Sequence, residues 1–106
     1  MLRQANSPFE LYAKDHVELT MQTMKGRLMV ALISLVREKG WNQKQTAEEL
    51  GVSQPRVSNL MNGQVSKFAV DTLFEMLCKI GFAIDVSYRD HDEESPIKVE
   101  IKKAVV

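Results

Sequence analysis

The sequence has little of what marks several common protein classes. Its only cysteine, Cys78, cannot form an internal disulfide, and apolar neighbours such as Leu77 and Ile80 predict a buried thiol. No run of about 18 apolar residues occurs, so we expect no membrane-spanning helix. The N-terminus lacks the charged-then-apolar pattern of a secretion signal, so we expect a cytoplasmic protein.

An excess of either charge is also missing. The chain has 14 basic and 14 acidic residues and a formal net charge of zero. Proteins that bind nucleic acids indiscriminately normally carry a large basic excess, so this class is disfavoured. A specific binder with local basic groups remains compatible, because acidic residues concentrate in 85–95 and leave the remainder mildly basic.

The sequence contains no pattern typical of catalysis or of a cofactor site. We find no nucleophile with a matching base, no glycine loop for phosphates and no cluster of metal ligands, so we expect neither an enzyme nor a cofactor. No cysteine, histidine or carboxylate lies near His16 in a spacing typical of metal ligands. The run Asp90-His91-Asp92 could hold a metal weakly, but a solvated turn is favoured.

The length of 106 residues and the 44% hydrophobic content indicate one small domain with tails. Residues 1–14 have little periodicity and are expected to be a flexible N-terminal segment. Phe9, Leu11 and Tyr12 could form an apolar hook for a partner, although fold-back or disorder is favoured. Helical periodicity begins at Asp15 and continues to Lys39. Gly26 predicts either two helices or one bent helix there.

The most informative stretch is 42–60, which predicts two short helices joined by a glycine turn. Asn42 and Ser53 are suitable N-caps, Gly51 suits a left-handed turn, and Pro55 fits the first turn of the second helix. Helical hairpins with a glycine are common in helical proteins. The joint occurrence of these caps with correctly spaced apolar residues is much rarer and favours a DNA-binding helix-turn-helix.

Beyond this stretch, a helix is expected from about Val70 to Ile80, after a loop at 64–68. After this helix, apolar residues recur at every second position, which predicts strands at Phe82–Tyr88 and near Ile97–Lys102. Because one strand pair is marginal alone, the strands are expected to need a partner, either a second copy or another protein, and a two-fold dimer that pairs Phe82–Tyr88 is the simple solution. The predicted fold is mainly α, with a helical domain at 15–81 and a β extension at 82–106. The predicted dimer interface consists of Phe82, Ile84, Val86 and Tyr88.

The stretch resembles the Xre/Cro-like, or lambda-repressor-like, helix-turn-helix family. The resemblance covers about residues 25–82 and is carried by Gln43, Ala47, Gly51, Val52, Ser53, Val57 and Ser58. It is closer still to the HigA-type antitoxins of that family. The features that suggest this are the run Gly51–Ser58, the loop Asn62–Phe68 and Asp71-Thr72-Leu73 ahead of Gly81.

The second helix is expected to enter the major groove of DNA. The predicted base contacts are Gln54, Pro55, Arg56 and Asn59. Because a loop such as 64–68 lies along the DNA backbone in this family, Ser66 and Lys67 are expected to bind phosphates. The predicted phosphate contacts are Gln43, Lys44, Ser53, Ser58, Ser66 and Lys67. A dimer would read a near-palindromic operator.

These features together predict a sequence-specific repressor of transcription. The antitoxin resemblance implies that it regulates its own operon and neutralises an RNA-cleaving toxin of the HigB/RelE type. One alternative is a stand-alone or prophage-type repressor without a toxin. Another is an interaction module that kept the fold without binding DNA, which the zero net charge and Pro55 favour slightly.

Overall fold

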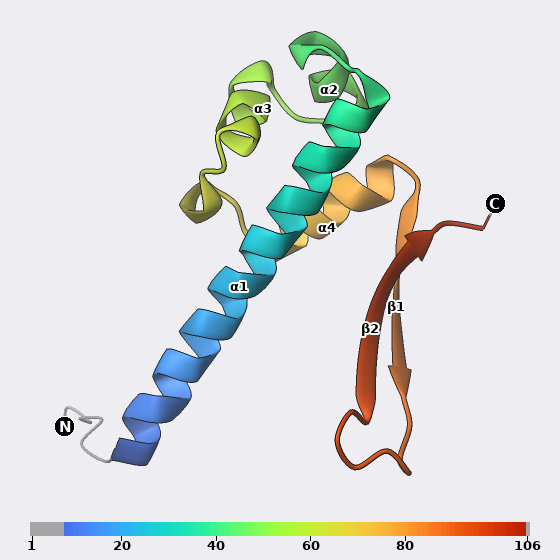
Figure 1. The fold of residues 1–106 in the computed structure, drawn as a ribbon. Coiled ribbons are helices and arrows are strands. Elements are labelled where there is room, and N and C mark those ends of the chain that lie inside the picture. Colours follow the sequence, from blue (N-terminus) through green and yellow to red (C-terminus); the bar gives the residue numbers. More distant parts are fainter. Residues whose placement is uncertain (1–7, 106) are drawn as a thin grey trace.

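The computed structural model describes residues 8–105 and consists of helices followed by a β-hairpin (Figure 1). This arrangement confirms the predicted mainly α fold with a C-terminal β extension. Among the described residues, no helix combines the length and apolarity needed to cross a membrane. The elements are α1 (Pro8–Lys39), α2 (Gln43–Leu50), α3 (Gln54–Met61), the short 3₁₀ helix η1 (Val65–Lys67), α4 (Val70–Lys79), β1 (Phe82–Tyr88) and β2 (Ile97–Lys103).

Helix α1 is one continuous element of 32 residues. It begins at Pro8, so the predicted start at Asp15 is wrong, and proline suits the first helical turn. Gly26 does not divide it, because a helical glycine costs only about 1 kcal/mol, which packing after Met24 can offset. Residues 1–7 of the predicted flexible segment lie outside the described residues.

The predicted apolar hook falls mostly outside what the structure describes, since the side chains of Phe9 and Leu11 are not placed. The third member, Tyr12, is exposed and stacks on the His16 ring, with 6.0 Å between ring centroids. The described part of the hook therefore does not fold back onto the helical core.

The core forms where the C-terminal half of α1 meets α2, α3 and α4. Its buried residues are Leu28, Met29, Leu32, Val36, Leu50, Leu60, Phe68, Leu73, Met76 and Leu77. Cys78 is exposed, so the predicted buried thiol is wrong. The buried stripe of α4 runs through Leu73, Met76 and Leu77, and the next residue in a helix turns about 100° away from it.

The β1–β2 hairpin is antiparallel, with Tyr88 opposite Ile97 and Val86 opposite Val99. Because directly opposite residues share a face, the apolar residues of both strands lie together on one side. Half-buried Phe82 packs against the core, whereas Val86 and Tyr88 are 64% and 71% exposed.

Two parts of the molecule extend away from the core and diverge in Figure 1. We call residues 8–23 of α1 the helical arm and residues 82–103 the hairpin arm. Every described side chain from Tyr12 to Thr23 is exposed. The radius of gyration is 17.3 Å, against about 13 Å for a compact domain of this length. The arms therefore leave much apolar surface without a partner in the described chain.

Candidate nucleic-acid interface

The first helix of the predicted motif, α2, begins with a reciprocal capping box. The side-chain oxygen of Asn42 accepts from the Gln45 N–H at 2.8 Å, and the Gln45 side chain accepts from the Asn42 N–H at 2.9 Å. Sequence reasoning missed buried Thr46, whose hydroxyl donates to the Asn42 carbonyl at 2.8 Å. Thr46 lies four residues after the cap residue Asn42, and this spacing in the sequence could have predicted the bond. These bonds fix where α2 starts.

The turn between α2 and α3 depends on Gly51, which has φ 68° and ψ 35°. This left-handed conformation is costly for other residues, as the sequence predicted. The next N–H, from Val52, donates to the Ala47 carbonyl at 3.0 Å, and the Val52 side chain packs against the core. The turn is therefore set both by local geometry and by burial.

Helix α3 is capped and oriented as the motif requires. The Ser53 hydroxyl accepts from the Arg56 N–H at 3.3 Å, with Pro55 in the first turn. Val57 and Leu60 are buried. The opposite positions Gln54, Pro55 and Ser58 are exposed, and Arg56 and Asn59 are half-buried. The helix thus presents a polar surface on a fixed apolar base.

A side-chain bond joins the starts of the two helices. Nε2 of Gln43 donates to the backbone carbonyl of Gln54 at 2.9 Å. Gln43 was predicted to contact a phosphate, and the structure places it against the N-terminus of α3. The bond holds the angle between α2 and α3 at the end that would face a ligand.

A second tertiary contact involves Arg56, which was predicted to read a base. Its Nη1 donates to the carbonyl of Lys67 at 2.8 Å, and its guanidinium carbon lies 4.3 Å from the centroid of the Phe68 ring. Arg56 is therefore joined to the loop after α3. The spacing of 11 residues between donor and acceptor carries no local signal that could have predicted this contact.

The predicted phosphate contacts lie on exposed parts of neighbouring elements. Lys44 is on α2, Ser58 on α3, and Ser66 and Lys67 on η1. Ser53 is exposed at the start of α3, where its hydroxyl already caps the helix. Figure 1 places α2 and α3 far from the tip of the hairpin arm. The candidate interface is thus separate from both arms.

The described residues give no sign of a metal site. No group of three or more His, Cys, Asp or Glu side chains in residues 8–105 is placed to hold an ion. Nδ1 of His91 lies 3.6 Å from an Asp90 oxygen, and both side chains are more than 80% exposed. Both residues lie in the exposed turn between β1 and β2.

Comparison with known proteins places this geometry in a family. The model of a helix-turn-helix domain family matches residues 13–89. The chain belongs to this helix-turn-helix family. The match runs from the helical arm to the start of the turn after β1. It is therefore longer at both ends than the region of about 25–82 that carried the resemblance in the sequence. No curated protein matches the chain significantly.

A solved protein named as an XRE family transcriptional regulator has a similar fold. Its TM-score is 0.66 at 26% sequence identity, and the match covers 84% of this chain and 97% of that one. This likeness supports the XRE type within the helix-turn-helix family. It also spans nearly the whole of the other chain, so the two proteins have comparable architecture.

Proposed function

We propose that this chain is a DNA-binding transcriptional regulator that represses from a near-palindromic operator. The observation that carries the proposal is the α2–α3 pair, with its capping box, left-handed Gly51 and exposed polar surface on α3. The helix-turn-helix family match and the likeness to an XRE family regulator support it. Such a pair places its second helix in the major groove.

The chemistry of α3 suggests how DNA would be read. The amides of Gln54 and Asn59 can each pair with the donor and acceptor of an adenine edge, and Pro55 can contact a thymine methyl group. Lys44 and Lys67 supply positive charge for phosphates, with hydroxyl donors from Ser53, Ser58 and Ser66. Gln43 would add its amide at the start of α2.

A homodimer would supply the affinity that one such helix lacks. The proposed interface is the apolar face of β1, namely Phe82, Ile84, Val86 and Tyr88. A two-stranded hairpin is marginal in water, so the exposed outer half of this face favours a second copy. An apolar groove of about 600 Å³ lies between the arms, lined by Ile101 and α1 residues including Leu19 and Met24. It would receive part of that copy.

Fluorescence anisotropy with the chain's own promoter tests the DNA-binding proposal. We expect specific binding that weakens about 5- to 150-fold in the Gln54→Ala variant, since a bidentate base contact discriminates by about 1–3 kcal/mol. Gln22→Ala, an exposed glutamine on the helical arm, is the matched control and should bind normally. Binding of neither the operator nor scrambled DNA by the unaltered chain would favour an interaction module instead, and equal binding of both would contradict a specific regulator.

The finer proposal is that this regulator is the antitoxin of a toxin–antitoxin pair and neutralises an RNA-cleaving toxin. The resemblance in Gly51–Ser58 and Asn62–Phe68 supports it, as do arms that lie away from the DNA-binding helices. A small basic protein encoded within a few bases should arrest growth when expressed alone and not when co-expressed with this chain. Without such a neighbour, or without rescue, the stand-alone regulator is preferred.

A further inference from the structure

Arg56 differs from the residues beside it on α3. Gln54 and Pro55 are exposed, whereas Arg56 is half-buried, because its side chain lies against the loop that follows the helix. Its Nη1 donates to the Lys67 carbonyl at 2.8 Å, and its guanidinium carbon lies 4.3 Å from the Phe68 ring centroid. Two consecutive loop residues, Lys67 and Phe68, therefore contact one side chain of α3.

The contact has a firm support on the loop side. Phe68 is only 2% exposed and belongs to the hydrophobic core, so its ring is a fixed platform. A planar guanidinium can stack on such a ring while one N–H points at a carbonyl, which a lysine ammonium cannot reproduce. The hydrogen bond also satisfies the carbonyl of Lys67, the last residue of η1, because the carbonyls at the end of a helix have no N–H partner within the helix.

The loop has weak internal support. Within η1 and its end, the Lys67 N–H donates to the Gln64 carbonyl at 3.1 Å and the Phe68 N–H to the Val65 carbonyl at 3.2 Å. A 3₁₀ helix of three residues has poor hydrogen-bond geometry and is readily deformed. At its start the loop is held by the Gln64 N–H, which donates to the Asn59 carbonyl of α3 at 3.0 Å, and by Val65, which packs against the core. Farther along, at Lys67 and Phe68, the hydrogen bond and the cation–π contact of Arg56 join the loop to α3.

We propose that Arg56 is a positioning residue that holds the 64–68 loop against α3, and that it does not read a base. Through the Lys67 carbonyl and the Phe68 ring it aligns the phosphate contacts of Ser66 and Lys67 with the base contacts of Gln54 and Asn59. Direct base reading then falls to those two amides and to Pro55. The part of this inference that concerns DNA rests on the proposed function.

Amide hydrogen exchange of the free protein tests the positioning without DNA. In Arg56→Ala we expect the Lys67 amide to exchange at least about tenfold faster, while amides of the helical core such as that of Leu32 keep their rates. Arg56→Lys should restore little of the protection, because it keeps the charge but loses the planar stack. Gln54→Ala is the matched control on α3. Unchanged loop exchange in Arg56→Ala would overturn the inference.

Operator binding then separates positioning from base reading. The slope of log K against the logarithm of the salt concentration counts phosphate contacts. In both Arg56→Ala and Arg56→Lys we expect its magnitude to fall by about 1, which corresponds to the loss of one phosphate contact. Penalties for single base changes in the operator should stay within about twofold of those of the unaltered chain. Lys67→Ala should cost less affinity in the Arg56→Ala background than alone, since both act on one contact.

The opposite pattern would assign Arg56 to a base. Loss of roughly tenfold discrimination at one base pair, with additive effects of Arg56→Ala and Lys67→Ala, would overturn the positioning role. Full restoration of the salt slope by Arg56→Lys would also overturn it, because charge alone would then suffice. If the unaltered chain binds no operator, the proposed function fails, and the exchange measurement still decides whether Arg56 orders the loop.

Discussion

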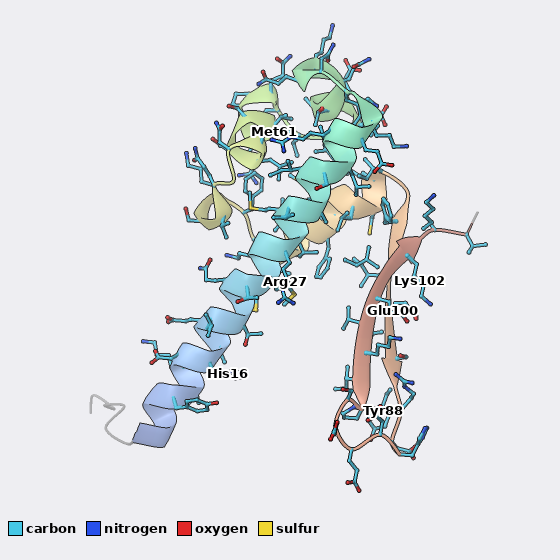
Figure 2. The ribbon with its side chains drawn as sticks, in the orientation of Figure 1. His16, Arg27, Met61, Tyr88, Glu100 and Lys102 are labelled. Atoms are coloured by element: carbon cyan, nitrogen blue, oxygen red, sulfur yellow. The ribbon has the colours of Figure 1, made fainter. Side chains whose placement is uncertain are left out.

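The helix-turn-helix core and the two arms use their apolar residues in opposite ways. In the core, from the second half of α1 to α4, leucines such as Leu32, Leu50 and Leu60 are fully buried. In the arms, large apolar residues such as Leu19 and Tyr88 are mostly exposed. Figure 2 shows Tyr88 near the free end of the hairpin arm. The core is therefore stabilised by its own contacts, whereas the arms leave large apolar side chains exposed to solvent. The predictions below test this difference.

The largest expected effect comes from deleting a core side chain. Leu60→Ala should lower the free energy of unfolding by about 2–5 kcal/mol, because it leaves a cavity at a fully buried site. Val99→Ala on the hairpin arm should change it by about 0.5 kcal/mol or less, provided that the measurement is made on monomer. Urea unfolding measures both. Similar losses at the two positions would remove the distinction between core and arm.

The next effect concerns the hairpin arm in a dimer. Tyr88→Asp should weaken self-association by about 2 kcal/mol or more, since an exposed tyrosine at an interface is a typical hot spot. Analytical ultracentrifugation gives the dissociation constant, and thermal unfolding at low concentration should show an intact core. Arg89→Asp, an exposed change in the neighbouring turn, is the control. A dimer as strong as the original would place the interface elsewhere.

Two glycines should respond with opposite signs. Gly51→Ala should destabilise the protein by about 1–2 kcal/mol, because φ is 68° and the new Cβ would also meet the Lys79 side chain. Gly26→Ala should stabilise it by about 0.5–1 kcal/mol, since a Cβ added there would meet no heavy atom of the described residues within 4 Å, apart from its chain neighbours and the backbone of its own helix. Thermal unfolding compares them. A stabilising Gly51→Ala would contradict the left-handed turn.

The last prediction tests the cap of α2. Asn42→Ala should cost about 1 kcal/mol, because it removes the acceptor for the Gln45 N–H. Asn42→Asp keeps an acceptor and should recover most of the stability. Urea unfolding of both variants, with amide exchange at Gln45, measures the cap. Equal stability of Asn42→Ala and the unaltered chain would mean that the rest of the motif holds α2 without it.

Local signals in the sequence predicted much of the candidate site. Asn42, Gly51 and Ser53 act over two to four residues, and each has the predicted conformation or bond in the structure. The prediction of a buried Cys78 failed for an equally local reason. A run of apolar neighbours does not define which side of α4 meets the core, and the stripe passes beside it.

The sequence by itself determined the two short helices, the glycine turn between them, the following helix and the alternation of both strands, because caps, turns and periodicity act between near neighbours. Only the tertiary structure decided the bond from Gln43 to the start of α3 and the placement of Arg56 on Lys67 and Phe68. Such contacts join residues 11 or more positions apart, and their formation depends on how the core brings the helices together.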